Sequence, residues 1–190
     1  MSIDRREVVA EILKSRENSL VIAGLGASAW DITAAGDCKL NFPLWGGMGG
    51  SITVGLGLAI AQPNRQILVF TGDGEILMGL GSLATVAVVS PPNLSIVVLD
   101  NEEYGETGKQ KTHTAFDTDL AGVAKACGIK RVSQINSADL TDSFKDDVYR
   151  GTGIFFGVIK VSNDSHKLIL PPRSGATLTR RFREELLGSS

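Results

Sequence analysis

Apolar residues recur along the chain in two different patterns. Short runs, most of them apolar over nearly their whole length, alternate with longer segments whose apolar residues recur every three or four positions. These patterns predict strands and helices, respectively. The predicted strands cover residues 20–23, 66–71, 94–99, 130–132 and 154–161. The predicted helices cover residues 3–17, 51–61, 76–89, 119–127, 137–149 and 178–187. The sequence therefore predicts an α/β fold, a doubly wound, mostly parallel sheet with helices on both faces.

Glycines and polar residues gather where the predicted strands end. Gly24-Leu25-Gly26, Gly72-Asp73-Gly74 and Asp100-Asn101 each follow an apolar strand directly. Ligands of doubly wound sheets bind beyond the carboxyl ends of the strands, so we expect these three segments to converge on one crevice. Residues 42–50, FPLWGGMGG, form a further glycine-rich loop. For two helices the sequence also suggests the N-caps: Ser137, and either Asp117 or Thr118.

Length and charge narrow the class of protein. The 190 residues carry 19 Lys and Arg against 21 Asp and Glu, a formal net charge of -2, and 43% of them are hydrophobic. This composition is typical of one globular domain spanning residues 1–190. A nearly neutral chain argues against binding to nucleic acid, which usually requires a basic face. The short basic stretch at residues 180–183 is followed by Glu184-Glu185, and we expect it to form a helix that docks on a partner subunit.

Targeting and cysteine signals point to a reducing compartment. The apolar runs all fall well short of the roughly 20 residues of a membrane span, so no membrane association is expected. The first residues are charged and have no apolar core of a signal peptide. Cys38 and Cys127 have no spacing typical of a disulfide framework or a zinc site. We therefore expect a cytoplasmic protein.

Asp73 lies in the turn between a predicted strand and the helix that follows. Free backbone N–H groups at such a turn favour a diphosphate, which a bare carboxylate would repel. A divalent cation between the two removes the conflict, and Mg²⁺ prefers oxygen ligands that it shares with substrate phosphates. Asn101, at the end of the next strand, offers an amide oxygen, and Glu103 offers a backbone carbonyl. The alternative is a strand–turn–helix connection without a ligand, because Gly-Asp-Gly alone is common.

The spacing of these residues resembles a known cofactor motif. Gly-Asp-Gly, a helix, and a strand ending in Asn are similar to the thiamine diphosphate motif, and FPLWGGMGG is similar to the segment that precedes it in thiamine diphosphate-dependent decarboxylases. The run LDNEEYGETGKQ most closely resembles sulfopyruvate decarboxylase beta subunits and the C-terminal part of phosphonopyruvate decarboxylases. The resemblance covers residues 18–162, the diphosphate-binding (PP) module of that superfamily, with a helix before it and a basic tail after it.

The resemblance implies a role for each matching residue. Asp73 and Asn101 match the side-chain ligands of Mg²⁺, and Glu103 matches the residue whose carbonyl completes the metal site. Met48 matches the apolar residue beneath the thiazolium ring, and Gly46 the carbonyl that holds the pyrimidine amino group. The residues implied to line the rest of the cofactor are Ala27, Ser28, Gly72, Gly74, Glu75 and Tyr104.

Glu75 departs from the pattern, since Ser or Ala is more usual after Gly-Asp-Gly in the decarboxylases. A second carboxylate near a diphosphate is unfavourable unless it turns away or binds the metal through water. Residues 102–115 form a long polar loop, and long ordered loops are often functional. Within it, His113 and Gln110 are candidate catalytic residues for proton donation and for binding an anionic substrate. The alternative for both is a solvated surface position.

The resemblance implies a beta (PP) subunit of a heteromeric 2-oxoacid decarboxylase. The leading substrate is sulfopyruvate, converted to sulfoacetaldehyde and CO2, with phosphonopyruvate decarboxylation or carboligation as alternatives. The activating glutamate is expected from a separate PYR-domain (alpha) subunit, because this chain is long enough for one such domain only. A non-catalytic cofactor-binding subunit is a further alternative. A Rossmann dinucleotide binder is disfavoured, since GLGASA lacks the third glycine of its fingerprint.

Overall fold

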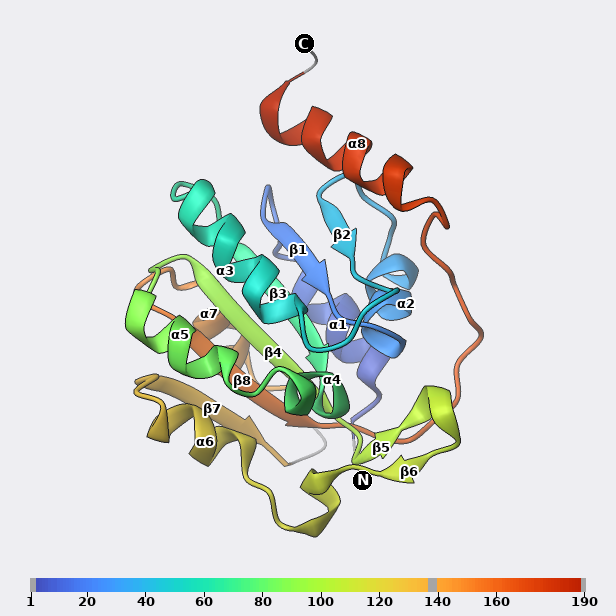
Figure 1. The fold of residues 1–190 in the computed structure, drawn as a ribbon, viewed down its shortest axis with the longest axis vertical. Helices are drawn as coiled ribbons and strands as arrows, with labels where there is room; N and C mark the ends of the chain where they lie inside the picture. The colour runs from blue at the N-terminus through green and yellow to red at the C-terminus, as the bar shows by residue number, and fades with distance from the viewer. Residues whose placement is uncertain (1–2, 137–139, 189–190) are drawn as a thin grey trace.

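A single parallel sheet forms the centre of the protein, and its strands run in the order β2-β1-β3-β4-β8-β7 (Figure 1). The computed structural model describes residues 3–136 and 140–188. Every pair of neighbouring strands in this sheet is parallel. The strands are β1 (Leu20–Ala23), β2 (Asn41–Pro43), β3 (Ile67–Gly72), β4 (Leu94–Asp100), β7 (Arg131–Ile135) and β8 (Phe155–Lys160).

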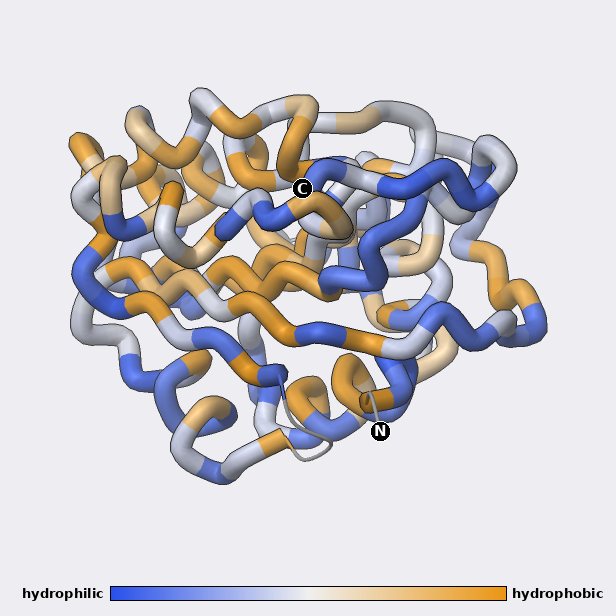
Figure 2. Tube along the Cα trace, turned by 90° about the horizontal axis from the view of Figure 1, so that it is seen from below, coloured by the Kyte–Doolittle hydropathy of each residue, from blue (hydrophilic) through white to orange (hydrophobic). Residues whose placement is uncertain are grey.

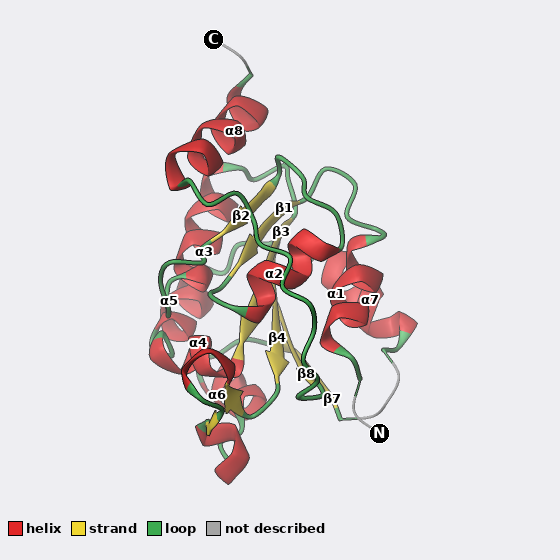
Figure 3. Ribbon diagram, turned by 90° about the vertical axis from the view of Figure 1, so that its right-hand side faces the viewer, coloured by secondary structure: helices red, strands yellow, loops and turns green. Residues whose placement is uncertain are grey.

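Helices cover both faces of the sheet (Figure 3). One face packs against α1 (Arg5–Leu13), α2 (Ala27–Ala34) and α7 (Asp142–Tyr149). The other packs against α3 (Ser51–Ala61), α4 (Asp73–Met78), α5 (Ser82–Val89), α6 (Leu120–Ala126) and α8 (Gly175–Leu187). Apolar segments therefore concentrate in the middle of the molecule, as Figure 2 shows. The predicted fold class is confirmed, since strands buried on both faces must be apolar on both.

The helix predicted over residues 76–89 is two helices, α4 and α5. The break falls at Gly79, whose backbone lies directly against that of Gly49 in the glycine-rich loop. A Cβ atom on Gly79 would stand 2.2 Å from the carbonyl oxygen of Gly49, so only glycine fits there. The apolar periodicity continues through the break and hides it from the sequence.

Two elements escaped the sequence analysis altogether. β2 has only three residues, and α2 has eight that are nearly all apolar or small, so neither shows a clear period. The segment 102–115, expected to be irregular, holds a small antiparallel hairpin with one 3-10 turn in its connection and a second 3-10 turn after it. Its elements are β5 (Glu103–Tyr104), η1 (Gly105–Thr107), β6 (Gln110–Lys111) and η2 (His113–Phe116).

Several predicted boundaries were wrong by a few residues because local capping decides them. Asp4 caps α1, whereas the helix was expected to begin at residue 3. Asp119 caps α6, in place of Asp117 or Thr118, and Thr141 caps α7. The expected cap Ser137 lies outside the described residues. β7 extends to residue 135, three residues beyond its predicted end.

α8 docks on this chain's own sheet, so the expectation that it binds a partner is wrong for its apolar face. Phe182 packs on Phe42 of β2, with ring centroids 5.1 Å apart, and Arg181 binds Asp37 at 2.6 Å. The connection from β8 to α8, residues 162–174, is called the strap below; it runs along the side of the molecule past the β5–β6 hairpin (Figure 1). Among the described residues, no helix is long and apolar enough to cross a membrane.

Candidate active site

The three glycine-containing and polar strand ends meet at one pocket, as the fold predicts. Its volume is about 440 Å³. The turn after β1, the turn from β3 into α4, and the end of β4 form its floor and walls. The β5–β6 hairpin and the strap contribute the remaining lining.

Most residues singled out from the sequence line this pocket. They are Ala27, Ser28, Met48, Gly72, Asp73, Gly74, Glu75, Asn101, Glu103 and Tyr104. Three others do not belong to the lining: Gly46, Gln110 and His113 are exposed. Gln110 instead folds back on its own hairpin, where its amide donates to the carbonyl of Thr107 at 2.7 Å. The structure therefore brings together the residues expected around the diphosphate, and leaves Gly46 and the two residues expected near the substrate on the surface.

Asp73 is the most deeply buried polar group of the pocket, with 1% of its surface exposed. Its Oδ2 atom accepts hydrogen bonds from the hydroxyls of Thr112 and of Thr114, the latter at 3.2 Å. Burial, together with the nearby charge of Asp100, raises the pKa of Asp73 to about 6, against the opposing effect of the two hydroxyls. A cation beside this carboxylate would favour its ionised form.

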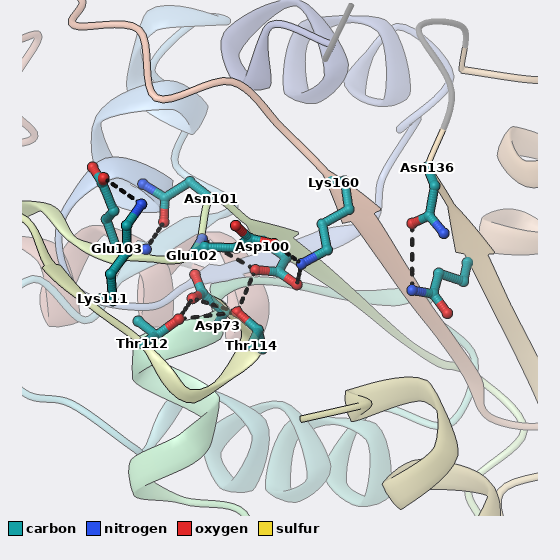
Figure 4. A network of polar contacts seen from close by, with 11 residues as sticks. Asp73, Asp100, Asn101, Glu102, Glu103, Lys111, Thr112, Thr114, Asn136 and Lys160 are labelled. Carbon is teal, nitrogen blue, oxygen red and sulfur yellow. Dashed lines mark hydrogen bonds and ion pairs between the residues drawn. The ribbon is translucent and has the colours of Figure 1, made fainter. Parts of the chain in front are cut away.

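A chain of polar contacts extends from Asp73 across the end of β4 (Figure 4). Thr114 donates to Asp100 Oδ1 at 2.8 Å, and the ammonium of Lys160 lies 2.8 Å from Asp100 Oδ2. Lys160 also binds Glu102 at 2.6 Å. Although burial opposes it, hydrogen bonds to Asp100 and Glu102 raise the pKa of Lys160, which therefore stays charged. Asp100 and Glu102 share this one ammonium, and Asp73 is joined to the same cluster through Thr114, so the cluster carries an excess of negative charge.

Asn101 shapes the backbone that leads into the hairpin. Its side-chain oxygen accepts from the backbone N–H of Glu103 at 3.2 Å, and Glu102 between them has a left-handed φ of 62°. Such an Asx turn reverses the chain tightly. The carboxylate of Glu103 pairs with Lys111 at 3.0 Å. Its backbone carbonyl, and not its carboxylate, is therefore the group available as a ligand in the pocket.

The residues present fit a hard divalent cation. Asp73, Asn101 and Glu103 offer a carboxylate, an amide and a carbonyl oxygen around one pocket, and oxygen donors of this kind suit Mg²⁺. The excess negative charge around Asp73 and Asp100 favours a cation as well. Among the described residues, no group of three or more His, Cys, Asp and Glu gathers as a metal cluster, so a metal site here depends on the mixed oxygen donors.

Glu75 turns its carboxylate toward the start of α3. It accepts from the backbone N–H of Ser51 at 3.2 Å, from the Ser51 hydroxyl at 2.8 Å, and from the hydroxyl of Thr71. Only 4% of Glu75 is exposed. Its carboxylate also fills the space where Gly24 would carry a side chain, since a Cβ there would lie 3.0 Å from Glu75 Cδ. Of the two ways expected for a second carboxylate to be tolerated, the structure shows the one in which it turns away.

The hairpin closes over both glycine-containing turns. Its Tyr104 ring lies against Gly74, where a Cβ atom would stand 2.5 Å from the ring. At its tip, Glu106 lies over Gly26, which has a left-handed φ of 81° and whose Cβ would stand 3.1 Å from Glu106 Oε1. Burial raises the pKa of Glu106, and the charge of Arg5 partly opposes this.

Sequence reasoning missed the side of the pocket that the strap forms. Arg5 donates to Asp31 at 2.8 Å and to the carbonyl of Asp164 in the strap at 2.9 Å. His166 Nε2 lies 2.7 Å from Asp4 Oδ2. Both Arg5 and His166 line the pocket. The two contacts with the strap join residues about 160 positions apart, and no local pattern signals them.

The protein is a parallel α/β domain with a pocket at the carboxyl ends of its strands, and this is the place where domains of that class bind diphosphate-containing cofactors. Within the class, the chain belongs to the thiamine pyrophosphate enzyme family. Residues 25–156 match the family described as "Thiamine pyrophosphate enzyme, C-terminal TPP binding domain". The resemblance drawn from the sequence motifs is thereby confirmed.

Similar proteins from methanogens carry one recurring name. The chain is 34% identical over 143 residues to a sulfopyruvate decarboxylase subunit beta of Methanocaldococcus jannaschii, covering 75% of this chain and 76% of that protein. It is 33% identical over 190 residues to the corresponding subunit of Methanothermobacter thermautotrophicus, covering 100% and 99%. It is 32% identical over 184 residues to a sulfopyruvate decarboxylase of Methanosarcina acetivorans, covering 96% of this chain but 47% of that longer protein.

A solved structure shares the fold at low sequence identity. A benzoylformate decarboxylase from Polynucleobacter necessarius superposes with a TM-score of 0.68 and 20% identity over 86% of this chain. The chain spans about a third of that protein, 34% of its length. The likeness confirms the domain architecture.

Proposed function

We propose that this chain is the PP (beta) subunit of a thiamine diphosphate-dependent decarboxylase that converts sulfopyruvate to sulfoacetaldehyde and CO2. The observation that carries the proposal is the meeting of Asp73, Asn101 and Glu103 at one pocket. The similarity to sulfopyruvate decarboxylase beta subunits, which extends over the full chain in one case, supports the choice of substrate.

In this proposal the floor of the pocket holds the cofactor's diphosphate. Asp73, Asn101 and the carbonyl of Glu103 would bind Mg²⁺, and the backbone of the turns at residues 26–28 and 72–74 would bind the phosphate oxygens. When bound, thiamine diphosphate supplies the electron sink for loss of CO2 from a 2-oxo acid. This chain then contributes binding and orientation.

Met48 and Gly46 are the residues proposed to orient the two rings of the cofactor. Met48 lies at the mouth of the pocket and is 36% exposed, which suits a side chain that supports a ring bound partly outside this domain. Gly46 is exposed two residues earlier in the same loop. The loop is anchored next to Gly79 by the close backbone contact of Gly49, so its position is set by α4.

The activating glutamate is proposed to come from a separate PYR-domain (alpha) subunit, in an α2β2 assembly. The name "subunit beta" of two similar proteins and the greater length of the Methanosarcina acetivorans protein, of which the match covers 47%, support a partner of comparable size. His113 and Gln110 are exposed, and we propose that they contact the anionic 2-oxo acid at the surface that the partner completes.

The proposal is tested by cofactor binding and turnover of the chain assembled with a sulfopyruvate decarboxylase alpha subunit. Asp73→Ala and Asn101→Ala should lose most affinity for thiamine diphosphate, because the diphosphate loses its bridging cation. The isolated chain should decarboxylate nothing, and the assembly should prefer sulfopyruvate to phosphonopyruvate. Unchanged cofactor affinity in both variants, or full activity of the isolated chain, would contradict the proposal. Tight cofactor binding without turnover in the assembly would favour the non-catalytic alternative.

A further inference from the structure

Two threonines that follow strand β6 contact the carboxylate of Asp73. Thr112 comes directly after β6, and Thr114 lies in η2. Thr112 and Thr114 lie 39 and 41 positions away from Asp73 along the chain, and both hydroxyls lie within hydrogen-bonding distance of the same oxygen, Oδ2 (Figure 4). Thr112 is fully buried and Thr114 is 8% exposed. The contacts therefore lie inside the protein, where a hydroxyl–carboxylate bond keeps its strength.

The same threonines connect Asp73 to the rest of the polar cluster. The two hydroxyl oxygens are 2.9 Å apart, and Thr114 also reaches Asp100 at 2.8 Å. Each hydroxyl has one proton to donate, so the two threonines together supply two hydrogen bonds to the carboxylates of Asp73 and Asp100. Lys160 pairs with the other oxygen of Asp100. This arrangement fixes the rotation of the Asp73 carboxylate with one oxygen engaged.

The threonines also fix the hairpin that bears Glu103. The backbone N–H of Thr112 donates to the carbonyl of Glu102 at 2.9 Å, and Lys111, the residue before Thr112, pairs in register with Glu103. The Tyr104 ring packs on Gly74, directly after Asp73. One hydroxyl at residue 112 thus ties the proposed carboxylate ligand to the strand that carries the proposed carbonyl ligand.

We propose that Thr112 and Thr114 are positioning residues for the cation site, acting through Oδ2 of Asp73 to present its other oxygen, and the carbonyl of Glu103, to the metal. The inference rests on the proposed function. Its consequence is that the hairpin and the metal site stabilise each other: loss of the hydroxyls weakens metal binding and loosens the hairpin, even though neither threonine is a ligand.

The experiment uses Mn²⁺ as a paramagnetic probe of the chain assembled with its alpha subunit and thiamine diphosphate. Thr112→Val removes the donor and keeps the shape, so Mn²⁺ affinity measured by electron paramagnetic resonance should fall about tenfold, the cost of an unpaired buried oxygen. Thr112→Ser restores the hydroxyl and should recover affinity to within about twofold of wild type. Thr33→Val is the matched control, since its hydroxyl bonds Ala29 within α2, and its affinity should not change.

Hydrogen exchange provides a second readout that needs no metal. In the full chain without Mn²⁺, Thr112→Val should speed exchange of the amides of residues 103–112, and Thr112→Ser should not. If Thr112→Val fails to fold, Thr114→Val is the second variant: it leaves the Thr112 bond to Asp73 in place, but it removes the other hydroxyl near Oδ2 and should still lower Mn²⁺ affinity. Wild-type Mn²⁺ affinity in the folded valine variants, or wild-type exchange in a folded Thr112→Val, would overturn the inference. Failure of the wild-type assembly to bind Mn²⁺ at all would instead overturn the proposed function.

Discussion

Replacing Asp31 by asparagine tests how the beginning of the chain supports the pocket. Asp31 is fully buried in α2 and accepts from the guanidinium Nε atoms of Arg5 at 2.8 Å and Arg6 at 3.0 Å. Arg5 is itself buried and reaches on to the strap through the carbonyl of Asp164. Asparagine keeps the shape but removes the charge. Its amide NH2 group would face one of the two arginines, and it cannot accept a hydrogen bond from that guanidinium.

The expected loss follows from burial. Removing one partner of a buried ion pair typically costs about 3–5 kcal/mol, because the other charge stays buried without compensation. The side chain of Asp31 is 0% exposed and that of Arg5 is 10% exposed, so Asp31→Asn should cost about 3 kcal/mol or more. That is a large share of the roughly 5–15 kcal/mol by which domains are stable, and it corresponds to a fall in melting temperature of about 6 °C or more.

The assay is urea unfolding of the full chain followed by circular dichroism, with hydrogen exchange of the strap as a second measurement. Lys14→Gln is the control, because Lys14 is 71% exposed in its pair with Glu11 and exposed pairs contribute little. Exchange should rise in residues 163–168 in Asp31→Asn, since Arg5 no longer holds a fixed position. If Asp31→Asn unfolds within about 1 kcal/mol of wild type, the argument that this buried pair stabilises the protein is wrong.

Three further predictions concern other parts of the molecule. Glu75→Gln should lower stability by about 1–3 kcal/mol in thermal unfolding, because one amide oxygen replaces two buried acceptors at the start of α3. The hydrogen bond from Arg181 lowers the pKa of Asp37. This contribution to stability is therefore intact at neutral pH and is lost as the pH falls from about 4 through the folded pKa, so exchange of the α8 amides should rise there. His113→Ala and Gln110→Ala should lower kcat of the assembled enzyme more than they lower its melting temperature.

Each of these has an outcome that contradicts it. Glu75→Gln with the melting temperature of wild type would mean that the carboxylate does not support α3. Asp37→Asn removes the titrating group, and an unchanged acid response of α8 in this variant would show that another group is responsible. Wild-type kinetics in both hairpin variants would leave His113 and Gln110 as surface residues.

The sequence could predict those parts of the site whose residues lie in short local segments. Asp73 and Asn101 each follow an apolar strand directly, and parallel topology brings the ends of such strands to one edge. Their meeting therefore follows from local pattern and fold class alone. The same logic predicted five of the six strands of the sheet, and missed only β2, which is too short to show a pattern.

The remaining features depend on how distant segments return to the pocket. Thr112 and Thr114 reach Asp73 only because the hairpin folds back, and a polar loop has no period that reveals this. Arg5 reaches Asp164 over a separation of 159 residues. Likewise, the break between α4 and α5 arises from the backbone contact of Gly79 with Gly49, which the apolar pattern of the segment conceals.

The position of β8 has a consequence for how the protein is made. β8 is the last strand along the chain, yet it lies inside the sheet, between β4 and β7. The chain leaves the ribosome N-terminus first. A nascent chain that lacks residues 155–160 therefore has β4 paired on one side only, with β3, and β7 without its partner in the sheet. Unpaired apolar edges of this kind favour aggregation. The strap follows β8 directly, so the pocket is closed only after synthesis has passed this strand, and chaperone protection should matter most just before it emerges.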